Sequence, residues 1–367
     1  MRILLLEPFM GESHAAWAKG FAQHSQHQIE IWGLPGRHWK WRMHGAAETF
    51  AARMNEMEVL PDLILATDML DLAGFLALTR KRTAQIPVAL YFHENQLAYP
   101  WSPNDPDKKL KRDNHYAYIN YRSALVADAV LFSSPYNQNS FLDALPTFLK
   151  AFPDHQEVKN VARIRAKSSL LSLGLELKTL DEFRPAEEVK NDVPLVVWNH
   201  RWEYDKCPDQ FFKALIELKE ENVPFELAVL GRSYQKSPAI FAEAKEMLAD
   251  RIVHWGFAES FEAYAKWLWR ADILPVTSQQ EFFGGSVVEA MYCNCLPLLP
   301  NALAYPDHIP QAYRSSILHN SENEFKEKLK AALLNELQLD GNPREWVQKY
   351  DWQSMIRQYD QLFESLI

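Results

Sequence analysis

Two glutamates that lie eight positions apart, Glu281 and Glu289, bracket a pair of glycines in the segment EFFGGSVVE. Because this segment follows the apolar run 273–276 and leads into another apolar stretch, it predicts a strand, a tight loop and a helix. Glycines allow the backbone to approach a ligand closely, and a helix N-terminus presents unpaired N–H groups with partial positive charge. The loop could therefore hold a phosphate or a sugar hydroxyl between two acidic side chains. Ser286 and Glu289 also fit a helix capping box, which is a purely structural alternative.

A second loop, residues 199–206, follows an apolar run and carries two cations, Arg201 and Lys206. Arginine offers a planar bidentate fork and lysine a point charge, so together they could clamp a diphosphate. In the structural alternative they pair with Glu203 and Asp205 of the same loop.

Four consecutive polar residues, His93, Glu94, Asn95 and Gln96, follow the apolar run 88–92. Four polar side chains directly after a buried strand are hard to explain as core. We interpret them as the lining of a cleft, where amides and an imidazole bind a hydroxyl-rich ligand. A lone histidine is often only structural, but these neighbours favour a functional role for His93.

Smaller signals lie at the ends of other apolar runs. Gly11 could allow a tight strand-to-helix turn at the cleft, although a single glycine is also common in structural turns. Gly231 and the segment around Trp255 also lie at the ends of apolar runs, so they are expected at the edge of the same cleft. Either Trp255 or Phe257 could line a nucleobase pocket, and packing explains aromatic residues there equally well.

The elements that must position these residues recur in two series. Short, continuously apolar runs alternate with stretches of helical period, which indicates parallel strands buried on both faces and covered by helices. The runs are 3–6, 29–32, 63–66, 88–92, 129–132, 195–198, 225–230, 252–254, 273–276 and 296–299.

The pattern predicts an α/β protein of two Rossmann-like, doubly wound domains that face each other across a cleft. The polar stretch 179–194 is the expected linker. We therefore expect an N-terminal Rossmann-like domain at 1–185, a C-terminal Rossmann-like domain at 186–345 and a closing helix at 346–367.

Composition narrows the class of protein. Hydrophobic content of 47% with 24% charged residues is ordinary for a soluble globular chain. Three cysteines cannot make a disulfide framework or a four-thiolate zinc site, so a reduced, cytoplasmic protein is expected. No segment reaches the roughly 20 apolar residues of a membrane span, and the run 3–6 is too short for the core of a signal peptide.

The net charge of −9 weighs weakly against a nucleic-acid partner, but the charge is unevenly distributed. Residues 1–185 hold 21 Lys and Arg against 20 Asp and Glu, whereas the remainder holds 18 against 28. The basic clusters all lie in the first half, at 37–42, 80–82, 108–112 and 159–167.

The segment Arg37-His-Trp-Lys-Trp-Arg42 mixes cations with aromatic rings, which suits phosphate contact and base stacking in single-stranded RNA. The alternative is a solvated edge with two packed tryptophans. The candidate RNA-binding residues of the segment are Arg37, Trp39, Lys40, Trp41 and Arg42.

Together these motifs resemble the retaining GT-B glycosyltransferases of family 4. More closely, they resemble the glycosyltransferase-like family whose animal members are tRNA-queuosine alpha-mannosyltransferases, over a span from Ile3 to about Pro310. The segments that carry the closer resemblance are Tyr91–Leu97 with Tyr99-Pro100, His200–Glu203 with Asp205-Lys206, His254–Gly256, and Glu281–Gly284 through Tyr292-Cys293.

The resemblance implies that the domain at 1–185 binds the acceptor and the domain at 186–345 binds the nucleotide-sugar donor. It also implies a role for each matching position. His93 would lie near the anomeric centre and Glu281 against the donor sugar, as the two catalytic residues. The implied donor-diphosphate residues are Arg201, Lys206, Gly11, Gly284 and Gly285; Glu289 would hold the ribose, with Gly231 and Trp255 near the base. Glu94, Asn95 and Gln96, with the segment 37–42, would serve the acceptor.

By this resemblance the reaction is a retaining transfer of mannose from GDP-mannose to queuosine at the wobble position of a tRNA anticodon. Arg201 and Lys206 would neutralise the diphosphate, so no metal and no cofactor are expected. No membrane partner is expected either. Two alternatives stay open. One is a family 4 enzyme with a lipid-linked or small-molecule glycan acceptor, and the other is a non-catalytic RNA- or nucleotide-binding module.

Overall fold

The computed structural model describes residues 1–101, 114–187, 191–232, 237–337 and 339–367. The chain forms two compact units, and the first contains Met1–Leu175 together with Trp352–Ile367. The second unit is continuous and contains Glu176–Asp351. The first division therefore lies at 175/176, where the sequence indicated 185/186. The reason is that the helical turn Leu177–Phe183 packs on the second unit, where Trp269 Nε1 donates to the Leu180 carbonyl over 2.7 Å.

The first unit is built on a six-stranded parallel sheet in the order β2-β1-β3-β4-β5-β6. Every apolar run predicted in this half is a strand. The additional strand β6 is a short edge strand of mostly polar residues. The strands are β1 (Arg2–Met10), β2 (Gln28–Pro35), β3 (Leu63–Thr67), β4 (Val88–Phe92), β5 (Ala129–Phe132) and β6 (Ser168–Leu170).

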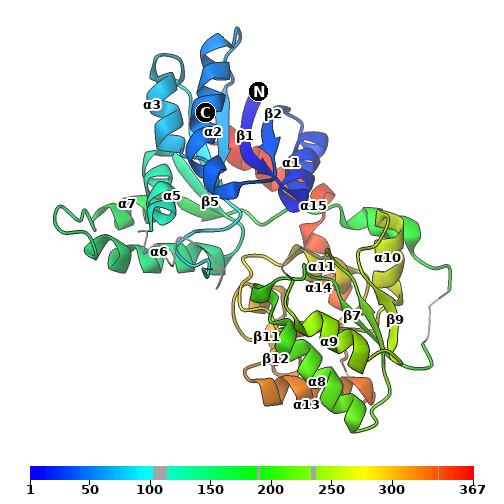
Figure 1. The fold of residues 1–367 in the computed structure, drawn as a ribbon. Coiled ribbons are helices and arrows are strands. Elements are labelled where there is room, and N and C mark those ends of the chain that lie inside the picture. Colours follow the sequence, from blue (N-terminus) through cyan, green and yellow to red (C-terminus); the bar gives the residue numbers. More distant parts are fainter. Residues whose placement is uncertain (102–113, 188–190, 233–236, 338) are drawn as a thin grey trace. The chain divides into compact units, whose positions relative to one another are not determined.

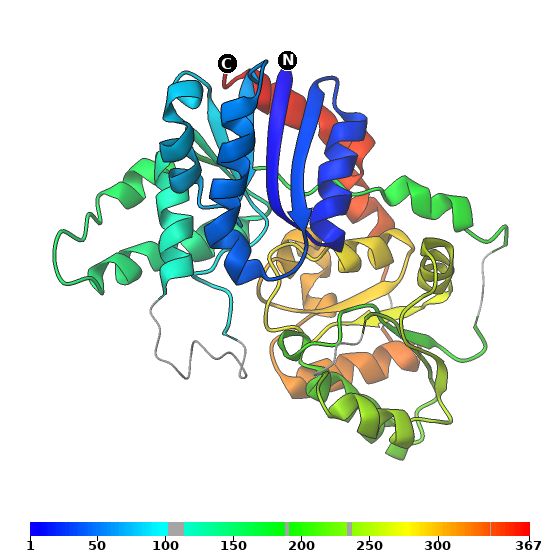
Figure 2. The same cartoon turned by 45° about the horizontal axis from the view of Figure 1, so that its top comes forward.

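Helices cover both faces of this sheet (Figures 1 and 2). Alternate strand residues such as Leu4 and Leu90 pack with Phe50 and Phe75, which lie on α2 (Trp39–Glu56) and α3 (Leu72–Thr83). On the other face the ring of Trp17 stacks on Tyr91, with 4.7 Å between the centroids. The remaining helices of this unit are α1 (Glu12–His24), α5 (His115–Val126), α6 (Pro135–Lys150), α7 (Asn160–Ala166) and α15 (Trp352–Glu364).

The closing helix predicted at 346–367 is present as α15 but is shorter than predicted. The structure has α14 (Pro343–Val347), a 3₁₀ turn, an extended Asp351 and then α15, which begins at Trp352. Helix α15 lies beside α1 in the first unit (Figures 1 and 2). There Trp17 Nε1 donates to the Tyr359 hydroxyl over 3.0 Å, and that hydroxyl donates to the Ser172 carbonyl over 2.8 Å.

The second unit has its own six-stranded parallel sheet, in the order β12-β11-β10-β7-β8-β9. Helices α8, α9 and α13 pack on one face around Trp198 and Phe212, and α10 and α11 lie on the other (Figure 1). The strands are β7 (Leu195–Trp198), β8 (Glu226–Val229), β9 (Ile252–Trp255), β10 (Ile273–Pro275), β11 (Leu296–Pro300) and β12 (Leu318–His319). The helices are α8 (Pro208–Glu220), α9 (Ile240–Met247), α10 (Phe261–Arg270), α11 (Gly285–Tyr292), α12 (Arg314–Ile317), α13 (Glu322–Leu333) and α14.

Each sheet has a point at which its strand order reverses. In the first sheet this point lies between β1 and β3, and in the second it lies between β7 and β10. Loops that leave the carboxyl ends of two such strands diverge and leave a crevice, where α/β proteins bind their ligands. The predicted site residues follow β1, β2 and β4 in one unit and β7, β8 and β10 in the other, and Trp255 is the last residue of β9.

Among the described residues, no helix is both long enough and apolar enough to cross a membrane. All three cysteines are free thiols, and both Cys293 and Cys295 are buried.

Candidate functional site

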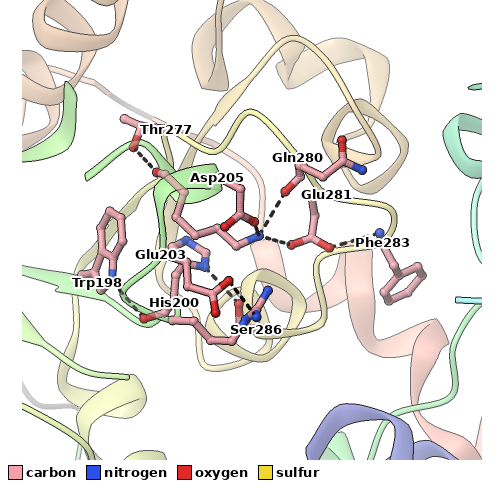
Figure 3. A network of polar contacts seen from close by, with 11 residues as sticks. Trp198, His200, Glu203, Asp205, Thr277, Gln280, Glu281, Phe283 and Ser286 are labelled. Atoms are coloured by element: carbon pink, nitrogen blue, oxygen red, sulfur yellow. Dashed lines mark hydrogen bonds and ion pairs between the residues drawn. The ribbon is translucent and has the colours of Figure 1, made fainter. Parts of the chain in front are cut away.

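The loops after β7 and β10 meet at a buried lysine (Figure 3). Lys206 Nζ donates to the Gln280 carbonyl over 3.0 Å and to Glu281 Oε2 over 3.2 Å, and it lies 3.4 Å from Asp205 Oδ2. The other oxygen of Glu281 accepts a longer hydrogen bond of 3.4 Å from the Phe283 N–H. A cation from one loop and a carboxylate from the other are therefore held together where the two strands diverge.

The charges in this cluster stabilise one another. Although burial disfavours the ammonium form, the carboxylates of Glu281 and Asp205 raise the pKa of Lys206 above its ordinary value. Burial likewise opposes ionisation of Glu281, but Lys206 lowers the pKa of that carboxyl. Both groups are thus charged at neutral pH. The carboxylate also keeps 21% of its side chain accessible, so it can accept a hydrogen bond from a ligand.

Arg201 lies closer to the surface than Lys206. Its Nη1 is 2.9 Å from Glu203 Oε2, which is the pairing that the structural alternative predicted. About half of the arginine side chain, 49%, is nevertheless accessible. A surface ion pair of this kind contributes about 1 kcal/mol or less, so an anionic ligand can compete for the guanidinium.

The Gly-Gly segment between the two glutamates starts a helix without a side-chain cap. Helix α11 begins at Gly285, and Gly284 precedes it in the left-handed conformation with φ of 92°. The capping-box interpretation is wrong because Ser286 lies inside the helix and Glu289 accepts a hydrogen bond of 2.7 Å from the Tyr264 hydroxyl. Burial raises the pKa of Glu289. The helix N-terminus is therefore left open to a ligand.

Two residues from the loop after β7 hold this helix start in place. Asn199 Nδ2 donates to the Ser286 carbonyl over 2.7 Å, and His200 Nδ1 lies 3.3 Å from the Ser286 hydroxyl. Burial, together with the nearby Lys206, lowers the pKa of His200 to about 3, so its imidazole is neutral. Hydrogen bonds thus join the loop after β7 to the start of α11, which follows β10.

The two aromatic candidates for a base pocket differ in environment. Trp255 packs in the core cluster, with its ring centroid 5.4 Å from Trp202 and 5.8 Å from Phe212. Phe257 is 54% exposed, and the guanidinium carbon of Arg232 lies 5.1 Å from its ring centre. The structure therefore gives Trp255 a packing role and leaves Phe257 as the accessible ring.

Gly231 lies in a place that only glycine can occupy. Its φ is +99°, and an added Cβ would fall 2.0 Å from the His200 carbonyl oxygen. The chain after β8 can therefore pass close to the loop after β7, beside the site.

In the first unit, His93 belongs to a buried cluster with Glu7 and His14. Glu7 Oε2 lies 3.1 Å from His14 Nδ1 and 3.8 Å from His93 Nε2, and Glu7 Oε1 accepts from the Phe9 N–H over 2.9 Å. Burial opposes protonation of His14, but Glu7 raises its pKa to about 9. Burial and the neighbouring His14 lower the pKa of His93 well below its ordinary value. The cluster holds one charged and one neutral imidazole.

Gly11 lies between the last residue of β1, the strand that carries Glu7, and the first residue of α1. Its N–H donates to the Phe9 carbonyl over 2.7 Å, and an added Cβ would lie 2.9 Å from the Phe9 ring. This is the tight strand-to-helix turn that the sequence predicted.

The polar residues after His93 do not all face a ligand. Asn95 is fully buried; its Nδ2 donates to Asn137 Oδ1 over 2.9 Å and its Oδ1 accepts from the Ala98 N–H over 2.9 Å. It therefore holds the loop rather than an acceptor, contrary to expectation. Gln96 Nε2 donates to Glu94 Oε1 over 2.9 Å, and both of these side chains are only partly buried.

The basic and aromatic segment 37–42 forms the approach to α2 and its first turn. Trp39 packs against Tyr116 with 5.0 Å between the ring centroids, whereas Trp41 is 63% exposed. Lys40 Nζ lies 5.6 Å from the ring centre of Trp101. Arg42 Nε donates to the Pro35 carbonyl over 3.3 Å. One tryptophan is thus packed and the other is exposed, and the basic cluster 108–112 lies outside the described residues.

Several residues of these clusters were not predicted as site residues. They are Glu7, His14, Asp205, His200 and Tyr264. Glu7 directly follows the first apolar run and His14 lies a few residues further on, at the start of α1, so their position in the sequence offered a signal. Tyr264 lies in mid-helix on α10 and offered none.

The sequence matches two families of known proteins. Residues 2–175 match the family described as tRNA-queuosine alpha-mannosyltransferase N-terminal, and residues 180–350 match glycosyl transferases group 1. The tRNA-queuosine alpha-mannosyltransferase of Drosophila melanogaster is 34% identical over 335 residues, which cover 89% of this chain and 85% of the fly protein.

Solved structures share the fold across the whole chain. The sucrose-phosphate synthase of Thermosynechococcus elongatus is similar with a TM-score of 0.70 and 16% identity, covering 100% of this chain and 99% of that one. Anabaena HepE, in complex with UDP and glucose, has a TM-score of 0.60 and 15% identity, covering 100% of both chains. At such identities the likeness concerns the fold alone, and it confirms the expected GT-B class.

Proposed function

The chain belongs to the tRNA-queuosine alpha-mannosyltransferase family, and on that premise we propose that it transfers mannose from GDP-mannose to the queuosine nucleoside of tRNA with retention of configuration. That it is a glycosyltransferase follows from its family. The donor nucleotide and the residues that bind it are our proposal.

The observation that carries the proposal is the buried ion pair between Lys206 and Glu281 beside the uncapped start of α11. A nucleotide sugar needs cationic groups at its diphosphate and acceptors for its sugar hydroxyls. Lys206 and Arg201 supply the first, together with the backbone N–H groups of Gly284 and Gly285. Glu281 supplies the second, and Glu289 on the next turn of the helix would accept from the ribose.

The reaction would then depend on positioning and electrostatic stabilisation. The bond between the anomeric carbon and the phosphate oxygen breaks, and the acceptor oxygen bonds the same face of that carbon. The acceptor's proton passes to the departing diphosphate, whose charge Lys206 and Arg201 stabilise. Since these side chains neutralise the leaving group, we expect transfer to continue in the presence of EDTA.

The acceptor would be served by the first unit. His93 lies at the carboxyl end of β4 with a neutral imidazole suited to a hydroxyl group. The exposed ring of Trp41, with Arg37 and Arg42 close by in sequence, would stack on a base and contact phosphates of the anticodon loop. In this proposal Glu94 and Gln96 contact the acceptor and Asn95 only supports their loop.

The alternatives are less well supported. A lipid-linked acceptor agrees poorly with basic residues that are interleaved with aromatic rings rather than arranged along an amphipathic helix. A non-catalytic module would not need a charged Lys206–Glu281 pair held by hydrogen bonds from two loops.

The decisive experiment offers radiolabelled GDP-mannose to the purified protein with tRNA that contains queuosine or lacks it. We expect label only in the queuosine tRNA, removable by α-mannosidase. Equal labelling of both pools, or of neither, would contradict the proposal. UDP-mannose, which changes only the base, and GDP-glucose, which changes only the sugar, test the two parts of the donor separately.

A further inference from the structure

In the buried cluster around His93, the carboxylate of Glu7 faces two imidazoles, those of His14 and His93. Oε2 faces His14 Nδ1 at 3.1 Å and His93 Nε2 at 3.8 Å, while Oε1 accepts from the Phe9 N–H. Glu7 is completely buried, so these neighbours rather than water surround its carboxylate. A carboxylate oxygen has two lone pairs and can accept from both rings at once.

The ring of His93 is fixed on several sides. It packs against His14 in a tilted arrangement, with 4.2 Å between centroids and an interplanar angle of 35°, and it meets Trp17 edge-on at 4.6 Å. Tyr91 lies against it at 4.9 Å, and the His93 backbone N–H donates to Asp68 Oδ1 over 2.8 Å. The ring plane is therefore set by packing, which leaves the position of the proton to be set by hydrogen bonding.

One buried atom of this ring has no hydrogen-bond partner. His93 Nε2 is enclosed, and nothing in the described part of the chain bonds to it within hydrogen-bond distance. Glu7 Oε2 faces it at 3.8 Å and offers a carboxylate and no proton. A lone pair on Nε2 would face that negative charge, whereas an N–H there would be attracted to it. Catalytic hydrogen bonds are often long in unliganded enzymes and shorten when substrate binds.

We propose that Glu7 is a positioning residue that holds His93 in the tautomer protonated on Nε2, which leaves Nδ1 as a hydrogen-bond acceptor for the substrate. His14 supports this arrangement by packing against the ring and by anchoring the shared carboxylate. The tautomer follows from the geometry alone, whereas the use of Nδ1 toward an acceptor hydroxyl rests on the proposed function.

The same three side chains have ligating atoms within 4.8 Å of one another and could be considered a metal site. The two rings are tilted by 35°, and one nitrogen of each faces Glu7 Oε2 at 3.1 Å and 3.8 Å. These side chains supply three ligands, whereas a structural zinc site has four. We therefore assign a proton rather than a metal ion to this cluster, and elemental analysis tests for bound metal.

The direct test is nitrogen NMR of the full-length protein with ¹⁵N-labelled histidine. His93→Asn identifies the His93 signals by their loss. We expect a neutral ring with the proton on Nε2 in the unaltered protein. A proton on Nδ1, or a cationic ring at pH 7, would overturn the proposal without recourse to any Glu7 variant.

Two variants then isolate the carboxylate. Glu7→Leu removes the acceptor, and we expect His93 to populate both tautomers; Glu7→Gln keeps an acceptor oxygen and should largely restore Nε2 protonation. An unchanged His93 tautomer in folded Glu7→Leu contradicts the assignment. Elemental analysis completes the test, because about one equivalent of zinc that disappears in His14→Ala would replace the proton with a metal.

Activity measurements separate this inference from the proposed function. We expect kcat with queuosine tRNA to fall at least about tenfold in Glu7→Leu while KM for the donor stays within about twofold, with Glu7→Gln recovering most of the rate. A donor KM that rises with kcat unchanged would remove the positioning role. If the unaltered protein transfers no mannose but its NMR spectrum shows the expected tautomer, the proposed function fails and the assignment of Glu7 stands.

Discussion

Lys206 Nζ lies 3.2 Å from Glu281 Oε2 although the two residues are 75 positions apart in the sequence. The contact exists because β7 and β10 are neighbours in the second sheet and their following loops leave from the same end. The ion pair thus joins the two loops whose residues we assign to the diphosphate and to the sugar.

The two members of this pair should respond differently to substitution. Lys206→Ala leaves the carboxylates of Glu281 and the buried Asp205 without their shared cation, which costs about 3 kcal/mol or more of stability as well as activity. Glu281→Gln keeps Lys206 paired with Asp205, so we expect a folded enzyme whose kcat falls about 100-fold.

Chemical denaturation and initial rates measure the two effects. Glu226→Gln, which breaks an exposed ion pair with Arg270, is the matched control and should change neither. A fully active Glu281→Gln enzyme would show that the carboxylate does not contact the donor.

Glu289 should govern donor affinity through its bond to Tyr264. The hydroxyl is 2.7 Å from the carboxylate, which is otherwise disfavoured by burial. Tyr264→Phe removes a hydrogen bond to a charged group, so we expect the Kd for GDP to rise about tenfold or more by calorimetry, with little change in kcat. An unchanged Kd would mean that Glu289 does not bind the ribose.

Phe257 and Trp255 provide a paired test of the base site. Phe257→Ala removes an exposed ring, and we expect GDP affinity to fall about tenfold with stability unchanged. Trp255→Ala opens the aromatic cluster of Trp202 and Phe212 and should destabilise the second unit by about 3 kcal/mol. Calorimetry measures the affinity for GDP, and urea unfolding measures stability. If Phe257→Ala destabilised the protein and Trp255→Ala weakened only GDP binding, Trp255 would be the residue that contacts the base.

The exposed Trp41 should contribute to tRNA binding and not to folding. Trp41→Ala is expected to weaken binding of the anticodon stem-loop about tenfold, and Arg37→Ala to reduce the salt dependence of that binding. Val59→Ala, at another exposed apolar residue of the same unit, is the control. Filter binding at several salt concentrations measures all three. Equal affinity of the Trp41 variant and the control would place the RNA elsewhere.

The Glu7–His14 pair predicts a loss of stability at alkaline pH. An unfolded histidine titrates near pH 6.5, whereas the pKa of His14 in the folded protein is about 9. A raised folded pKa gives stabilisation that is complete below pH 6.5 and is lost as pH rises through 9, about 3 kcal/mol in all. Urea midpoints at pH 6 and pH 10 should therefore differ in the unaltered protein and differ less in His14→Gln. An equal decrease in both proteins would assign the effect to other groups.

Much of the architecture could be predicted because buried parallel strands are continuously apolar. Each predicted run is a strand, while β6 and β12 escaped notice because each has only two or three residues and β6 includes two serines. Lys206 and Glu281 were identified because each follows such a run. Strand order is not written in local sequence, so the convergence of Glu7, His14 and His93 could not be predicted. Nor does sequence show that Gly256, with φ of +130°, separates a packed Trp255 from an exposed Phe257.

The return of α15 to the first unit has a consequence for synthesis on the ribosome. Trp17 and Phe21 on α1 pack against Tyr359, which lies near the end of the chain. The second unit is uninterrupted and has all of its strands before that segment emerges. Domains fold as units while the chain is being made. The unit that is translated first is therefore completed last, because α1 has no α15 to pack against until Trp352–Ile367 has been synthesised.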